Sequence, residues 1–137
     1  MQHIPSPDNS DTGIEREIVA KGLTAPRVTP ADIAANIVSE HYLNAGECAL
    51  GDTRDPAPFG EPGRPASPLD LLTFCVLVLR NGFTVTGESA CASPENFDPE
   101  IGKRIARENA AQKVWPLMGY VLKEQLFQMQ QPAQSPE

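Results

Sequence analysis

The sequence predicts a small α+β protein in which a central β-hairpin packs against helices. Two runs of strand-forming residues meet at Asn81-Gly82, a strong hairpin signal, because a type I′ turn needs positive φ at both positions. A helix start follows at Asp98-Pro99, and small residues recur at helical spacing after it. At 137 residues the chain has room for one ordinary domain, which we expect over residues 13–130.

Three stretches are predicted to lack regular structure. Residues 1–12 and 131–137 are polar and contain prolines with little to bury, so both are expected to be disordered tails. Residues 47–68 are rich in proline and glycine and show almost no periodicity, which predicts a long mobile loop. That loop is either a functional lid or a neutral insertion.

Two helices are expected before the loop. Apolar residues at helical spacing between Gly13 and Gly22 predict a short helix that Gly22 ends. A stronger start follows at Thr29-Pro30, where the threonine hydroxyl can cap the helix and Asp32 completes a capping box. This second helix is predicted to run to about Leu43 and to have one apolar face. Its members are Ile33, Ile37, Val38 and Tyr42.

A two-residue turn at Asn81-Gly82 would fix the register of the hairpin. Val78 would then face Val85, and Val76 would face Gly87, on the side predicted to form the core. The same register extends that side to the pairs Phe74–Ser89 and Leu72–Cys91. Cys75 and Cys91 would lie on opposite faces, so no disulfide is expected between them. The first strand is apolar on both faces and needs a helix, a third strand or a second subunit as cover, which predicts a homo-oligomer.

The segment after the hairpin is predicted to be helical. A helix starting at Asp98-Pro99 can run to Trp115, where Pro116 would kink or end it. The small-residue stripe is expected to face the hairpin; it consists of Gly102, Ala106 and Ala110. Asn109 beside the stripe is predicted to be buried and hydrogen-bonded to backbone. A further helix is expected to about Met129.

Composition excludes several classes of function. A net charge of −7 disfavours binding to duplex nucleic acid, which depends on neutralising phosphates. No apolar run is long enough to span a membrane. The three cysteines lack CxxC spacing and are expected to be reduced thiols. A zinc site built from His41, Cys48 and Cys91 lacks the usual paired ligands, so no metal or cofactor is predicted.

Three sequence blocks resemble a known family. They are KGLTAPRVTPADI (21–33), LLTFCVLVLRNGFTVTGESACASPENFD (71–98) and IGKRIARENAAQKVWPLMGY (101–120). They are similar to the small phage protein family named for gene forty-nine of coliphage N-four and gene sixty-six of a Shigella phage. The resemblance implies a phage or prophage protein. The reduced thiols and the lack of a membrane span or signal segment add the expectation that it is located in the cytoplasm of the bacterial host. The resemblance implies no catalytic residues, and the chain departs from the family pattern at Arg107, Ala111 and Met118.

The residues favour binding over catalysis. The two histidines, His3 and His41, have no motif partner, and no phosphate-binding loop is present, so no enzyme activity is predicted. Free backbone N–H groups at the start of the helix after Pro99 could hold a small nucleotide-like anion. The candidate ligand-binding residues are Lys21, Arg27, Glu88, Lys103, Arg104, Asn109 and Trp115.

Two roles follow from these candidates. By analogy of setting, a phage accessory protein of this size could sequester the nucleotide signals of host immunity. The alternative is a protein-interaction module that engages a host or phage enzyme through its apolar strand or the corner from Trp115 to Tyr120. Purely structural roles are the alternative for the same residues. Lys21 and Arg27 could be solvated or could cap helices, and Trp115 could be a core anchor.

Overall fold

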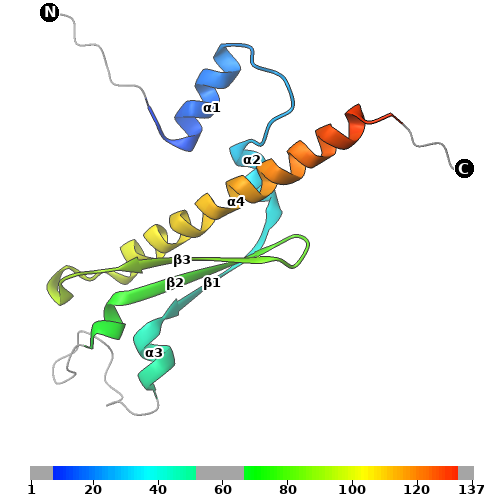
Figure 1. The fold of residues 1–137 in the computed structure, drawn as a ribbon. Helices are drawn as coiled ribbons and strands as arrows, with labels where there is room; N and C mark the ends of the chain where they lie inside the picture. The colour runs from blue at the N-terminus through cyan, green and yellow to red at the C-terminus, as the bar shows by residue number, and fades with distance from the viewer. Residues whose placement is uncertain (1–7, 52–66, 133–137) are drawn as a thin grey trace, which may run out of the picture. The chain divides into compact units, whose positions relative to one another are not determined.

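The computed structural model describes residues 8–51 and 67–132 (Figure 1). It confirms the α+β class: a three-stranded antiparallel sheet in the order β1-β2-β3 packs against a long helix. The elements are α1 (Asp11–Ala20), α2 (Pro30–Asn36), β1 (Ile37–Asn44), α3 (Ala45–Leu50), the 3₁₀ turn η2 (Pro68–Leu71), β2 (Leu72–Leu79), β3 (Thr84–Ala90), the 3₁₀ turn η3 (Pro94–Asn96) and α4 (Pro99–Gln130).

The chain forms two compact units. Residues 36–114 make the first, here called the sheet unit, and the segments before and after them make the second. The sheet unit contains all three strands and the first half of α4. A single domain over 13–130 stays a prediction.

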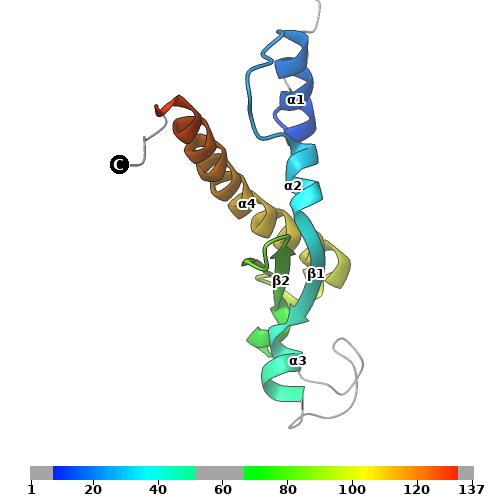
Figure 2. The same cartoon turned by 90° about the vertical axis from the view of Figure 1, so that its right-hand side faces the viewer.

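The first half of α4 lies along one face of the sheet (Figures 1 and 2). Its small residues Gly102, Ala106 and Ala110 are all buried, as predicted. At Gly87 of β3 the two backbones come so close that a Cβ there would clash with the backbone of Ala106 and Ala110. The buried core also includes Cys75, Leu77, Leu79, Val85, Ala111 and Val114. Small side chains on both elements are therefore what allows α4 to approach the sheet.

The hairpin reverses at Asn81 and Gly82 as predicted, but its turn is not type I′. Gly82 has a φ of 89°, whereas no other described residue of this turn has positive φ. The backbone N–H of Gly82 donates to the Leu79 carbonyl, and the N–H of Leu79 donates to the Phe83 carbonyl, both at 2.8 Å. These bonds enclose a three-residue loop, a type I turn that closes with a glycine bulge.

The extra loop residue shifts the strand register by one position. Leu77 lies opposite Val85 and Cys75 lies opposite Gly87, so the predicted pairs Val78–Val85 and Val76–Gly87 are wrong. A shift of one residue moves every β2 side chain to the other face. The predicted core side of β2 is therefore the half-exposed side, and the buried side begins at Thr73 and continues through alternate residues to Leu79.

Cys75 and Cys91 are free thiols in the structure. The prediction that these two cysteines lie on opposite faces is wrong, because the one-residue shift moves Cys75 to the other face of β2. Cys91 follows the last residue of β3, where its N–H donates to the Leu71 carbonyl.

A third strand occupies part of the predicted second helix. The helix begins as expected: the Asp32 N–H donates to the Thr29 hydroxyl, and the Thr29 N–H donates to the Asp32 carboxylate. It ends at Asn36, and residues 37–44 form β1, which pairs with β2. The prediction of helix to Leu43 is wrong because pairing with an apolar neighbouring strand outweighs a helical spacing only two turns long.

The face of the sheet opposite α4 is open in the sheet unit. Its apolar side chains come from β2 and are half-exposed: Leu72, Phe74, Val76 and Val78. Two of the covers predicted for this strand are therefore present, since α4 covers one face and β1 extends the sheet. The second face is left without a cover from the described residues of this unit.

The second unit begins with the predicted short helix. Ser10 caps α1, and Gly22 ends it at a φ of 68°. The N–H groups of Gly22 and Leu23 donate to the carbonyls of Val19 and Ile18, the pattern of a Schellman motif. Because α1 starts at Asp11, the predicted disordered tail over 1–12 is too long; residues 1–7 lie outside the described residues.

The predicted loop over 47–68 is partly regular. Residues 47–50 belong to α3, and η2 begins at Pro68. Residues 52–66 lie outside the described residues, as do 133–137 of the predicted C-terminal tail. The last helix is also longer than predicted, because α4 continues through Pro116 to Gln130.

Candidate functional site

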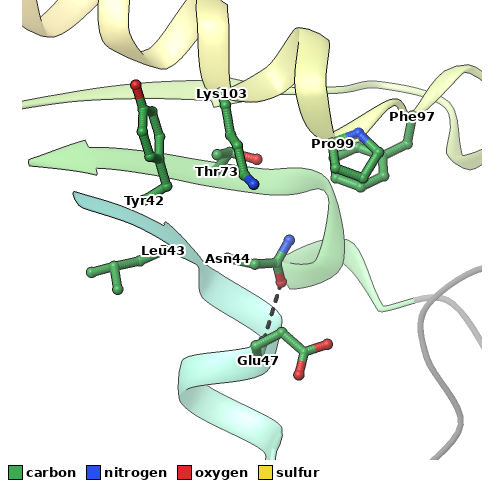
Figure 3. A pocket seen from close by; sticks show the side chains of 8 residues that line it. All are labelled: Tyr42, Leu43, Asn44, Glu47, Thr73, Phe97, Pro99 and Lys103. Carbon is green, nitrogen blue, oxygen red and sulfur yellow. Dashed lines mark hydrogen bonds between the residues drawn. The ribbon is translucent and has the colours of Figure 1, made fainter. Parts of the chain in front are cut away.

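A pocket opens in the sheet unit where the end of β1 meets the start of α4 (Figure 3). It has a volume of about 270 Å³. The residues that line it are Tyr42, Leu43, Asn44, Glu47, Thr73, Phe97, Pro99 and Lys103. Half of these residues are apolar or aromatic, and among the described lining residues Lys103 is the one cation and Glu47 the one acid.

Lys103 and Tyr42 face one another across the pocket. Lys103 extends from α4 toward β1, and Tyr42 extends from β1 toward the helix (Figure 3). The ammonium nitrogen lies 5.9 Å from the centre of the Tyr42 ring, within the range of a cation–π contact. It also lies 3.6 Å from the carboxylate of Glu100. An ammonium group that keeps much of its exposure, next to an aromatic ring, can receive an anion at modest desolvation cost.

A hydrogen-bond network under α4 fixes the position of Tyr42. Its hydroxyl donates to Glu40 Oε2 at 2.9 Å, and Arg107 Nε donates to Glu40 Oε1 at 2.7 Å. Burial and the neighbouring Glu40 carboxylate raise the pKa of Tyr42 to about 12. The phenol therefore stays protonated at neutral pH, and its one O–H donor is taken up by Glu40. Burial also raises the pKa of the Cys75 thiol, so this cysteine is not a thiolate nucleophile.

The pH dependence of stability should reveal the Glu40–Arg107 pair. The hydrogen bond from Arg107 lowers the pKa of Glu40 below the ordinary value of 4.5. A lowered pKa stabilises the folded state above about pH 4.5, and this contribution is lost as the pH falls through the folded-state pKa. Arg107→Met should therefore be destabilising at pH 7 by less than about 1 kcal/mol, since both side chains remain about a third exposed.

Urea unfolding of the wild type and of Arg107→Met at several pH values measures this effect. The difference between the two proteins should shrink between pH 5 and pH 3. Arg104→Met, which removes an exposed guanidinium from the same helix, should show no such trend. A constant difference down to pH 3 would show that the Glu40 carboxylate is not stabilised by Arg107.

Asn44 holds the floor of the pocket together. Its side-chain oxygen accepts from the Glu47 N–H at 3.1 Å and so caps α3, as the dashed line in Figure 3 shows. Its side-chain nitrogen donates to the Asp70 carbonyl at 2.8 Å. One side chain therefore links the end of β1 to α3 and to η2. The floor of the pocket is therefore held in place by hydrogen bonds between secondary-structure elements.

Four of the predicted site residues lie in the sheet unit, and only Lys103 lines the pocket. Arg104 is exposed on the next position of α4. Glu88 is exposed on β3, on the face away from α4, so it does not reach the pocket. Asn109 donates to the Glu88 carbonyl at 2.9 Å, which confirms its predicted bond to backbone, although the side chain is exposed and not buried.

The remaining predicted site residues lie in the second unit. Lys21 pairs with Glu17 at 3.0 Å on the surface of α1. Arg27 makes two hydrogen bonds to the Glu15 carboxylate, at 2.5 and 2.6 Å. Trp115 is half-buried on α4. Both cations pair with acids of their own unit, as Lys103 does with Glu100, but neither of them lines the pocket between β1 and α4.

The start of α4 does not offer the free N–H groups that the sequence suggested. The Asp98 carboxylate accepts from the N–H of Glu100 at 2.9 Å and of Ile101 at 3.3 Å. The Gly102 N–H donates to the Asp98 carbonyl. Because a carboxylate already caps this terminus, an anion would meet negative charge there. Lys103 must therefore act from its side chain and not with the helix end.

The other lining residues were missed from the sequence. Asn44-Ala45-Gly46-Glu47 has the spacing of a capping box, and that signal could have revealed α3. Nothing comparable marks Tyr42 or Phe97, because their positions depend on β1 and on a register that the turn shifts. The pocket is a product of tertiary packing and not of a local motif.

The described residues contain neither a cluster of metal ligands nor a helix suited to a membrane. Within 8–51 and 67–132, no group of three or more histidine, cysteine, aspartate or glutamate side chains could hold a metal ion. None of the helices in the same ranges combines the length and the apolar character of a membrane span.

Comparison with known proteins identifies the chain at the level of its family. The model of the phage protein family described as N4 Gp49/phage Sf6 gene 66 matches residues 28–126. The chain belongs to this family. The matched range includes every element that forms the pocket, from β1 to the first half of α4. No curated protein and no solved structure matches the chain.

Proposed function

We propose that this phage protein is a non-enzymatic accessory protein that binds a small nucleotide-like anion in the pocket between β1 and α4. The observation that carries the proposal is the placement of Lys103 beside the ring of Tyr42, in a pocket whose other walls include Leu43, Phe97 and Pro99. A flat ring of a ligand can pack against the aromatic side chains that line the pocket, Tyr42 and Phe97, and an anionic group can pair with the Lys103 ammonium. Such a site suits a ligand that has both parts.

The size of the pocket limits what one chain can enclose. Pockets for drug-sized ligands span roughly 300–1,000 Å³, and this one has about 270 Å³. A single nucleotide unit is therefore the part that we expect to enter. For a cyclic dinucleotide or a larger host immune signal, one unit would occupy the pocket and the rest would project from it. Sequestration of such signals is the role that this binding would serve.

Calorimetry against a panel of nucleotides tests the proposal. The panel contains mononucleotides, cyclic di- and trinucleotides and cyclic ADP-ribose isomers. Lys103→Ala should weaken the binding of any ligand found by about tenfold to a hundredfold, because it removes a charged hydrogen bond. Arg104→Ala removes an equal charge from the next residue, outside the pocket, and should change the affinity little.

Two results would contradict this function. One is silence across the whole panel at high micromolar concentration. The other is an equal loss of affinity in Lys103→Ala and Arg104→Ala, which would indicate attraction by net charge and no pocket. Mass spectrometry of ligand released by heat tests the non-enzymatic role, since the ligand should be recovered unchanged.

A second candidate function is the engagement of a host or phage enzyme. The observation that favours it is the open face of the sheet, where alternate apolar side chains of β2 are half-exposed. Affinity capture from infected cells separates the two functions, because a ligand sink should bring down no stoichiometric protein. A captured protein that is lost on Phe74→Asp, with calorimetry silent, would favour this second function.

A further inference from the structure

The second half of α4 presents an exposed face that combines aromatic and charged side chains. The side chains of Tyr120 and Phe127 are 73% and 48% exposed. Lys123 and Glu124 lie between them and are also exposed. These four residues have the spacing i, i+3, i+4, i+7, which places them on one side of an α-helix. We call them the 120–127 face; all four belong to the second unit.

Other exposed apolar side chains of the same helix segment are Leu117, Val121 and Met129. Half-buried side chains occupy the other side of the segment, namely Trp115, Met118, Leu122 and Leu126. The segment is therefore apolar on two sides, and only one of them is shielded by the described residues. Two exposed aromatic side chains seven residues apart lie on the same side of a helix, and this spacing favours packing against a second helix.

We propose that the 120–127 face binds the same face of a second copy of the chain, with the two helices antiparallel. Place the two-fold axis between positions 123 and 124. Lys123 then lies against the partner's Glu124, and Glu124 lies against the partner's Lys123. Positions 120 and 127 are equally far from this axis, so Tyr120 lies against the partner's Phe127, and the reverse pair forms as well.

Charge complementarity favours a second copy of the chain as the partner and an antiparallel orientation of the two helices. The face carries one base and one acid at adjacent positions, and a two-fold axis between them converts both into attractive pairs. A parallel pair would instead place Lys123 against the same lysine and Glu124 against the same glutamate, which is repulsive. The aromatic pairs add contact area at the two ends of the charged centre. The same surface thus complements itself in one orientation.

The proposal is independent of the ligand pocket, since the two use different residues in different units. Sedimentation equilibrium on the full chain, from low micromolar to submillimolar concentration, gives the dissociation constant of the dimer. Lys123→Glu places acids against acids at both charged contacts, and Glu124→Lys places bases against bases. Each single variant should raise the dissociation constant about tenfold or more.

The mixture of the two variants is the deciding sample. In a heterodimer of Lys123→Glu with Glu124→Lys, two acids on one chain face two bases on the other, so a dimer should form again. Arg104→Glu makes the same charge change away from the face and should leave the dissociation constant unchanged. Circular dichroism of each variant verifies that the helix is retained.

Three results would overturn the proposal. They are a wild-type chain that stays monomeric at submillimolar concentration, single variants that dimerise like the wild type, and a mixture that fails to recover association although each variant is folded. Recovery in the mixture, with the Arg104→Glu control unaffected, would establish the antiparallel pair.

Discussion

Gly87→Ala should separate α4 from the sheet and strongly destabilise the fold. A Cβ at this position would lie 2.2 Å from the backbone nitrogen of Ala110 and 2.3 Å from the backbone oxygen of Ala106. Neither atom can move unless the helix itself moves. Overpacking in cores costs roughly 1–3 kcal/mol and more where backbone must shift, so we expect a loss of about 3 kcal/mol or more.

Urea unfolding measures this loss, and Gly119→Ala is its matched control. Gly119 also lies in α4, but an added Cβ there meets nothing within 4 Å. Alanine has the higher helix propensity, so this variant should be more stable by about 0.5–1 kcal/mol. If Gly87→Ala unfolds at the same urea concentration as the wild type, α4 does not lie on β3.

Leu77→Ala should cost far more stability than Val76→Ala, although the two residues are neighbours in β2. Leu77 is fully buried under α4, and Val76 is half-exposed on the open face. Removal of a buried leucine side chain costs about 2–5 kcal/mol, through lost burial and the cavity that remains. Val76→Ala should cost only about 1 kcal/mol, mainly from lower strand propensity.

Comparison of the two unfolding curves also tests the register. The register predicted from a two-residue turn would bury Val76 and expose Leu77, and would therefore reverse the order of the two losses. Equal losses would show that both faces of β2 are covered, for example by a second subunit on the open face.

The sequence was informative wherever a local signal had one physical meaning. Gly22 ended α1, Thr29 and Asp32 capped α2, and Asp98 with Pro99 started α4. The small residues of α4 faced the sheet because only a narrow helix face can approach strands so closely. The helix ends depend on a few adjacent residues, and the packing of α4 depends on a side-chain pattern that leaves only one close approach.

Predictions failed where the local structure depends on residues that are distant in the sequence. Ile33 and Ile37 fit a helix spacing, yet β1 forms from residue 37 because β2 offers a strand to pair with. A single added residue in the turn moved all β2 side chains to the other face. Since the pocket depends on β1 and on that register, its aromatic wall could not be predicted. Lys103 was found only because it lies at the start of a recognisable helix.

The central claim is that α4 lies on the sheet face that contains Gly87 and Leu77, since the pocket exists only in that arrangement. A nuclear Overhauser spectrum of the labelled protein tests it most directly. A strong cross-peak is expected between the Gly87 Hα protons and the Ala110 amide proton, because the two backbones are in close contact. The absence of this cross-peak, together with contacts from the side chains of Thr86 or Glu88 to α4, would contradict it.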